Sequence, residues 1–183
     1  MRDNILRAWG HAAAFQAAGE VWYPNANEAA QSLADTHGLT LEQTAGVIAV
    51  FSPRLLWETN FIEARTYIER RETVYQCGPN LIKASLVLSG HFDAIRGPKV
   101  RPFWQAICEP WGLTPPVIDR HTICVAMGRT LTDKERKPYG AGNVHAAAMI
   151  REIQAAFLLA AERLRVHHHT LQATTWLWQR NRG

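Results

Sequence analysis

The sequence lacks the features that define several classes of protein. No apolar run approaches the roughly 18 residues that a membrane-spanning helix requires, and no secretory signal is recognisable. The three cysteines, Cys77, Cys108 and Cys124, are widely spaced and form no Cys-x-x-Cys pair, which argues against the usual zinc and iron–sulfur sites. We therefore expect a cytoplasmic protein with reduced, mostly buried thiols, no metal, no cofactor and no membrane partner.

The sequence also lacks clear strand signals, internal repeats and low-complexity tracts. The β-branched run 46–51 could form a strand, but a capping box of Thr40 and Gln43 precedes it and favours a helix. Pro24 is expected to open a helix that stops at Gly38, and Cys77-Gly78-Pro79 to separate two others. The apolar pattern predicts helices over residues 4–18, 24–37, 45–51, 55–71, 80–88, 99–107, 121–127, 143–164 and 170–179.

The composition is that of an ordinary globular protein. The chain has 183 residues, of which 47% are hydrophobic and 20% charged, and a chain of this length buries roughly 70% of its unfolded surface. We expect one all-α domain arranged as two helical lobes around a cleft. The net charge of +4 and the isoelectric point near 9.2 suit a polyanionic partner without requiring one.

A basic turn at Gly97-Pro98-Lys99 is the first candidate for a site. Gly97 permits a backbone conformation that other residues resist, and the helix after it would direct backbone N–H groups toward an anion. Arg96 and Arg101 add positive charge beside Lys99. An ordinary junction between a loop and a helix, with solvated basic residues, explains the same pattern.

A carboxylate at the start of an apolar helix is the second candidate. In Val117-Ile118-Asp119-Arg120-His121, Asp119 is placed as the N-cap, with Thr122 three residues later. Capping and catalysis both fit Asp119, and one carboxylate can do both. His121 alone is more often a packed or hydrogen-bonded residue than a catalytic one.

Two further segments give weaker signals. Ser52-Pro53-Arg54 ends a helix at a turn that would expose Arg54 to a nucleic-acid groove, although a surface arginine beside a buried Trp57 fits equally. The triplet 167–169, three histidines, indicates a metal site only weakly, because consecutive positions do not share one face of a helix.

The order of these segments resembles the helix-hairpin-helix (HhH-GPD, endonuclease III-like) DNA glycosylase superfamily over about residues 40–130. The residues that carry the resemblance are Gly46 to Arg54 for an apolar helix and its turn, Asn80 to Ala84 for an Asn-x-x-Lys-Ala segment, Gly97-Pro98-Lys99 for the end of the hairpin, and Val117 to His121 for the stretch with the essential aspartate. The N- and C-terminal helices would complete the second lobe. The hairpin has one glycine where the family has two, and the four-cysteine iron–sulfur loop is absent.

The resemblance implies an enzyme that flips a base out of double-stranded DNA and cleaves its N-glycosidic bond. Asp119 would activate the nucleophile or stabilise the sugar oxocarbenium, and Lys99 matches the amine that attacks C1′ in members with lyase activity. The implied DNA contacts are Arg54, Arg96, Gly97, Arg101 and Ser52, and the candidates for the base pocket are His121, Trp57, Asn60 and Tyr23. An attacking amine has to be neutral, so Lys99 is expected to be partly buried and within a few ångströms of Asp119.

A second resemblance is to small bacteriophage-encoded proteins that begin with Trp-Tyr-Pro and end with Leu-Gln-Ala-x-x-Trp, as Trp22 to Pro24 and Leu171 to Trp176 do here. It implies a monomer working in the cytoplasm of a bacterial host. Two alternatives stay open: a phage enzyme that transfers an amine onto a thymine-derived base in DNA, and a non-catalytic DNA-binding or inhibitor module.

Overall fold

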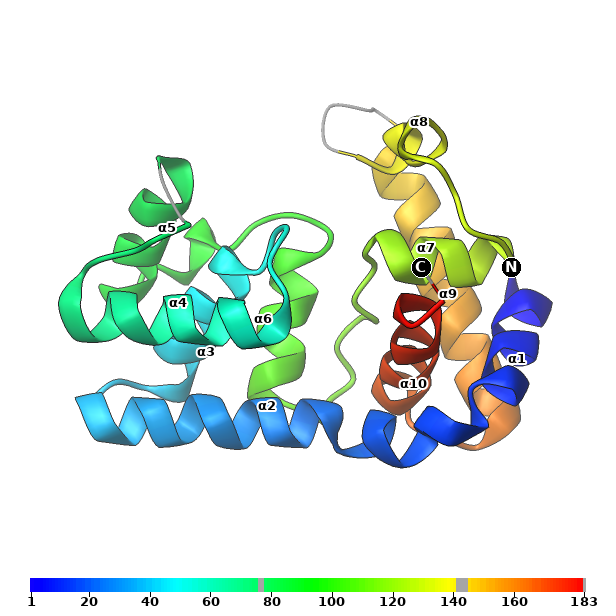
Figure 1. Ribbon diagram of the computed structural model, residues 1–183, viewed down its shortest axis with the longest axis horizontal. Coiled ribbons are helices and arrows are strands. Elements are labelled where there is room, and N and C mark those ends of the chain that lie inside the picture. Colours follow the sequence, from blue (N-terminus) through cyan, green and yellow to red (C-terminus); the bar gives the residue numbers. More distant parts are fainter. Residues whose placement is uncertain (76–77, 141–144, 183) are drawn as a thin grey trace. The chain divides into compact units, whose positions relative to one another are not determined.

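The computed structural model describes residues 1–75, 78–140 and 145–182, and this part of the chain contains helices and no strand (Figure 1). The expectation of an all-α protein is confirmed. None of the described helices is long and apolar enough to cross a membrane. The elements are α1 (Arg2–His11), η1 (Ala13–Phe15), α2 (Gln16–His37), α3 (Leu41–Phe51), α4 (Trp57–Arg70), α5 (Pro79–Leu88), η2 (Phe92–Ala94), α6 (Val100–Cys108), α7 (Arg120–Met127), α8 (Asp133–Arg136), η3 (Lys137–Tyr139), α9 (Ala146–Leu164) and α10 (His168–Arg180).

The chain divides into two compact units. The terminal unit comprises Met1–Pro24 and Trp111–Gly183, and the central unit comprises Asn25–Pro110. Helix α2 runs through the boundary at residues 24 and 25. The segment 40–130, which carries the glycosylase resemblance, therefore falls partly in each unit.

Helix α3 is the core of the central unit. It packs against α4, α5 and α6, and every residue from Thr44 to Phe51 is buried. Its N-terminus carries the predicted capping box: the Thr40 hydroxyl accepts from the backbone N–H of Gln43, and the Gln43 side chain accepts from the backbone N–H of Thr40. Gly46 allows the close approach of α5, since a Cβ at this position would lie 2.6 Å from a methyl of Val87. The apolar run is thus a buried helix, as its capping box indicates.

The terminal unit is a bundle in which α1, α7, α9 and α10 pack against one another (Figure 1). Its largest fully buried side chains include Ile5, Ile153, Phe157 and Leu171, one or two from each of α1, α9 and α10. The first part of α2 lies directly on α10, because a Cβ on Gly19 would fall 2.7 Å from the backbone nitrogen of Thr174. This contact places Trp22 beside Trp176 and Tyr23 beside Gln172, both on α10.

The prediction that a helix begins at Pro24 is wrong. Helix α2 starts at Gln16 and contains Pro24 in its interior, so the helix tolerates the loss of one backbone donor there. The predicted helix 4–18 is instead divided by a 3-10 turn after His11. Short elements such as α8 escaped prediction because one turn is too short to show a helical period. The predicted break at Cys77 and the first residues of the predicted helix 143–164 lie outside the described residues.

Candidate functional site

Asp119 is the N-cap of α7, as predicted, and both of its carboxylate oxygens accept hydrogen bonds. Oδ1 accepts from the backbone N–H groups of His121 and Thr122 at 2.9 and 3.0 Å, and the Thr122 hydroxyl lies 3.2 Å from it. Oδ2 accepts from the indole Nε1 of Trp176 on α10 at 2.9 Å. The carboxylate is therefore held in one orientation by α7 on one side and by α10 on the other.

A group of aromatic rings lies beside this carboxylate within the terminal unit. The Trp176 ring lies edge-on to Trp22 at 5.9 Å and to His121 at 6.0 Å, and Trp22 lies edge-on to Tyr23 at 4.7 Å. The guanidinium of Arg180 lies 5.3 Å from the centre of the Trp176 ring. Asp119 thus lies in a set of flat side chains, and such side chains can stack on a base or stabilise a cation.

Tyr23 is buried next to this carboxylate. Its hydroxyl donates to Oε1 of Gln172 on α10 at 2.8 Å. Burial, and secondarily the charge of Asp119, raise the pKa of Tyr23 well above its ordinary value. Tyr23 is consequently a neutral phenol at physiological pH, able to donate a hydrogen bond and unable to serve as a base.

His121 is the other titratable group beside Asp119. Burial lowers the pKa of its imidazole, the Asp119 charge opposes this shift, and the charges of Arg120 and Arg180 reinforce it. The Nε2 atom of His121 accepts from Nε of Arg120 at 3.0 Å. His121 is therefore a neutral ring near a carboxylate, which suits contact with an uncharged base.

Two of the predicted basic turns meet in the central unit. Gly97 has a φ of 103°, which confirms that this position needs a conformation suited to glycine. Lys99 is partly buried at the N-cap of α6, and its Nζ donates to the carbonyl of Ser52, the C-cap of α3, at 3.3 Å. Since the C-terminal end of a helix favours positive charge, this position suits a Lys99 ammonium.

The other predicted DNA contacts lie around these turns. Arg54, Arg96, Gly97 and Arg101 are exposed, and Arg54 has a left-handed backbone with a φ of 69°. Arg96 donates to the Asp93 carbonyl at 2.8 Å and forms an exposed ion pair with its carboxylate at 3.5 Å. Ser52 is 5% exposed and its hydroxyl is buried, so what it contributes here is the carbonyl that holds Lys99.

The four predicted pocket residues fall in different units. Tyr23 and His121 belong to the terminal unit, near Asp119, whereas Trp57 and Asn60 lie on α4 of the central unit. Asn60 is buried and donates to the Ile48 carbonyl at 3.0 Å, so it fastens α4 to α3. Trp57 packs against Phe61 with ring centres 5.8 Å apart.

Lys99 and Asp119 also belong to different units. The expectation that they lie within a few ångströms of one another stays a prediction.

Trp176 is a neighbour of Asp119 that the sequence pattern did not predict. The sequence signal that could have identified it is that Trp22 to Pro24 and Leu171 to Trp176 occur together in the second resemblance. These two segments pack together beside the carboxylate.

The described thiols, Cys108 and Cys124, are free, as expected, and Cys77 lies outside the described residues. Burial, with the charges of Glu42 and Glu109, raises the pKa of Cys108 to about 12, so this residue is not a nucleophile at neutral pH.

The fold and the site together define an all-α protein of two compact units, with a helix-capping carboxylate among aromatic side chains in one unit and joined basic turns in the other. The chain belongs to a family of unknown function (DUF7178), which it matches over residues 1–183. No curated protein and no solved structure matches it.

Proposed function

We propose that this protein is a helix-hairpin-helix, DNA glycosylase-like enzyme that acts on a modified or damaged base flipped out of double-stranded DNA. The reaction breaks the bond between C1′ of the sugar and the base nitrogen, whose electron pair leaves with the base. Water then adds at C1′ and its proton is released. Asp119 is the catalytic group, and the enzyme works as a monomer in the cytoplasm of a bacterial host.

The observation that carries the proposal is the environment of the Asp119 carboxylate. Departure of a base leaves positive charge on the sugar, and a fixed carboxylate stabilises such charge without having to reorient. Three donors hold this carboxylate in place, two backbone N–H groups and the Trp176 indole. The rings of Trp22, Trp176 and the neutral His121 are suited to a flat, uncharged base, which a flipping enzyme has to bind outside the stack.

The basic turns of the central unit support a nucleic-acid substrate. Arg54, Arg96 and Arg101 are exposed, and Lys99 links the turn at residue 52 to the turn at residue 97. Backbone N–H groups and arginines at a helix N-terminus are the groups that bind a DNA phosphate. Arg54 would occupy the gap that the flipped base leaves.

Lys99 decides whether the enzyme also has lyase activity. Attack of its amine on C1′ would give a Schiff base and permit strand cleavage, but the amine has to be neutral at that moment. The Ser52 carbonyl at the end of α3 favours the charged form. A lyase reaction therefore requires that DNA binding release Lys99 from this carbonyl.

The test is a panel of duplexes that carry uracil, thymine mismatches, oxidised purines or hypermodified pyrimidines, incubated with the protein and assayed for free base. Asp119→Asn keeps a side chain that caps α7 well while removing the charge. We expect it to lower the rate of base release by about 10²-fold or more. Asp3→Asn, an exposed carboxylate in the same unit, is the matched control and should leave the rate unchanged.

Borohydride trapping separates the two forms of the reaction. A covalent adduct that disappears in Lys99→Ala assigns the amine mechanism, whereas base release without an adduct assigns the chemistry to Asp119 alone. A heavier base in place of a free one would instead indicate the related amine transfer onto a thymine-derived base.

One observation favours a second candidate, a non-catalytic DNA-binding module. All the donors described for Asp119 belong to the protein itself, and two of them are the N–H groups that any N-cap satisfies. In that case Asp119→Asn and Lys99→Ala would leave DNA binding intact, no duplex of the panel would lose its base, and charge reversal at Arg54, Arg96 and Arg101 would abolish binding.

A further inference from the structure

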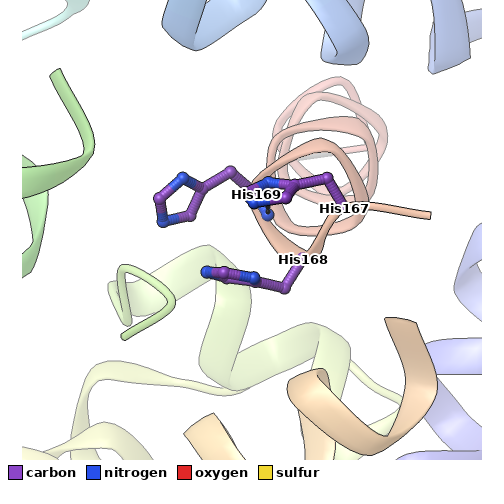
Figure 2. A group of neighbouring side chains, drawn as sticks. All are labelled: His167, His168 and His169. Atoms are coloured by element: carbon purple, nitrogen blue, oxygen red, sulfur yellow. Dashed lines mark hydrogen bonds between the residues drawn. The ribbon is translucent and has the colours of Figure 1, made fainter. Parts of the chain in front are cut away.

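The first turn of α10 brings three imidazole rings together. His167 is the N-cap and keeps an extended backbone, with φ −67° and ψ 139°, while His168 and His169 begin the helix. The centres of the three rings lie 4.3, 4.4 and 5.1 Å apart (Figure 2). Consecutive histidines point away from one another when all three are helical, but His167 precedes the helix and its ring can turn toward the other two.

The spacing of the ring nitrogens is close to that of a metal site. One nitrogen from each ring lies within 4.8 Å of the other two. A point equidistant from three atoms at this separation is about 2.8 Å from each, and the nitrogen–zinc distance is about 2.0–2.1 Å. Inward movements of about 0.7 Å or less per ring would therefore complete the coordination.

Thr114 orients two of the rings from outside the cluster. Its carbonyl lies 2.7 Å from Nε2 of His168, and because a carbonyl only accepts, this nitrogen carries the proton and leaves the lone pair on Nδ1. Its hydroxyl lies 3.1 Å from Nε2 of His169. Metal-binding histidines typically have such an outer hydrogen bond, which fixes the tautomer and the direction of the ring.

His167 contributes a weakly engaged nitrogen. Its Nδ1 accepts from the backbone N–H of His169 at 3.3 Å, a long bond that a bound ion would replace. While Nδ1 accepts, the proton of the neutral ring is on Nε2, which is buried and lies toward the backbone of Trp111 and Gly112. The ring also lies edge-on to the exposed Trp111 at 5.4 Å.

We propose that His167, His168 and His169 form a binding site for one divalent transition-metal ion of the kind that prefers imidazole, such as Zn²⁺. Three nitrogen ligands leave at least one coordination position for water or another oxygen donor. The bound ion would hold the three rings of the first turn of α10 together, and Thr114 holds two of them from outside. This site is independent of the proposed function, although Tyr23, whose ring centre is 5.0 Å from that of His169, connects the cluster to the surroundings of Asp119.

The experiment uses the full chain without a purification tag, stripped of metal by a chelator and then titrated with Co²⁺ or Zn²⁺. We expect one equivalent to bind, with visible absorption typical of nitrogen-bound Co²⁺ and a rise in the melting temperature. His167→Asn retains a residue that caps helices well and removes the imidazole, and we expect it to weaken binding at least tenfold. His91→Ala, an exposed histidine of the central unit, is the matched control and should bind as the wild type does.

Two further variants distinguish a loss of metal binding from a loss of folding. Thr114→Val preserves the volume of the side chain and removes only the hydroxyl near His169, so we expect roughly a tenfold loss of affinity with an unchanged circular dichroism spectrum. His168→Gln should abolish the Co²⁺ absorption. The proposal is overturned if the stripped, folded protein binds no stoichiometric metal, or if His167→Asn and His168→Gln bind it as tightly as the wild type.

Discussion

Three arginines hold a left-handed backbone, Arg54, Arg71 and Arg165, with φ between 57° and 69°. Arg71 and Arg165 are C-caps of α4 and α9, where this conformation ends a helix. Arg54 instead lies in the turn after α3, on the exposed surface that we propose meets DNA. A bulky residue in this region costs about 1–2 kcal/mol relative to a right-handed conformation, and such cost is often found at functional positions.

Arg54→Gly therefore separates stability from function. We expect the free energy of unfolding to stay unchanged or rise by up to about 1 kcal/mol, because relief of the strain slightly outweighs the added freedom of glycine in the unfolded chain. Affinity for duplex DNA should fall. Arg165→Gly is the control, because it makes the same backbone change at the exposed end of α9. We expect its free energy of unfolding to change as that of Arg54→Gly does, while its affinity for DNA stays that of the wild type. Equal DNA binding by both variants would remove Arg54 from the proposed interface. Chemical denaturation and fluorescence anisotropy measure the two quantities.

At the scale of elements, the features that the sequence predicts correctly are those determined by a few neighbouring residues. The caps at Thr40 and Asp119 and the left-handed turn at Gly97 each depend on a few neighbouring residues, and all three are present. The interior position of Pro24 was missed, because a proline is common at the start of a helix and no local signal shows that α2 already begins at Gln16. Trp176 was missed for another reason: it is 57 residues from Asp119 and reaches it through the packing of α10 on α7.

The contact between α2 and α10 gives a prediction at this scale. A Cβ at Gly19 would lie 2.0 Å from the Thr174 hydroxyl oxygen and 2.7 Å from its backbone, so Gly19→Ala has to push the two helices apart. We expect a loss of about 1–3 kcal/mol in the free energy of unfolding, as in other overpacked interiors. Because Trp22, Tyr23 and Trp176 lie on the same two helices, the surroundings of Asp119 should also be disturbed.

Gly10→Ala is the matched control for that substitution. Gly10 is exposed near the end of α1, and a Cβ there would meet nothing within 4 Å. Alanine is favoured over glycine in a helix by about 1 kcal/mol in the interior and by less near an end, so stability should stay equal or rise. Urea titrations of the two variants measure the difference, and equal stability of both would contradict the close approach of α2 and α10.

At the scale of the whole molecule, the charge balance favours polyanionic partners such as DNA. The net charge is +4, which gives a general attraction to polyanions that does not depend on where the charges lie. A specific interface differs from this attraction because its affinity depends on particular cations. The two possibilities can be separated by variants that change the net charge equally and at different places.

We expect the double variant Arg96→Glu and Arg101→Glu to weaken duplex binding by at least tenfold at moderate salt, because both residues lie beside the Gly97 turn. Reversing Arg151 and Arg163, two exposed arginines on α9 of the terminal unit, also lowers the net charge from +4 to 0 but should cost far less. In the first variant the slope of log affinity against log salt should also become shallower by about 0.9 for each DNA phosphate that the protein no longer neutralises. Equal weakening in the two variants would mean that net charge alone attracts DNA, and the basic turns of the central unit would then have no special part in binding.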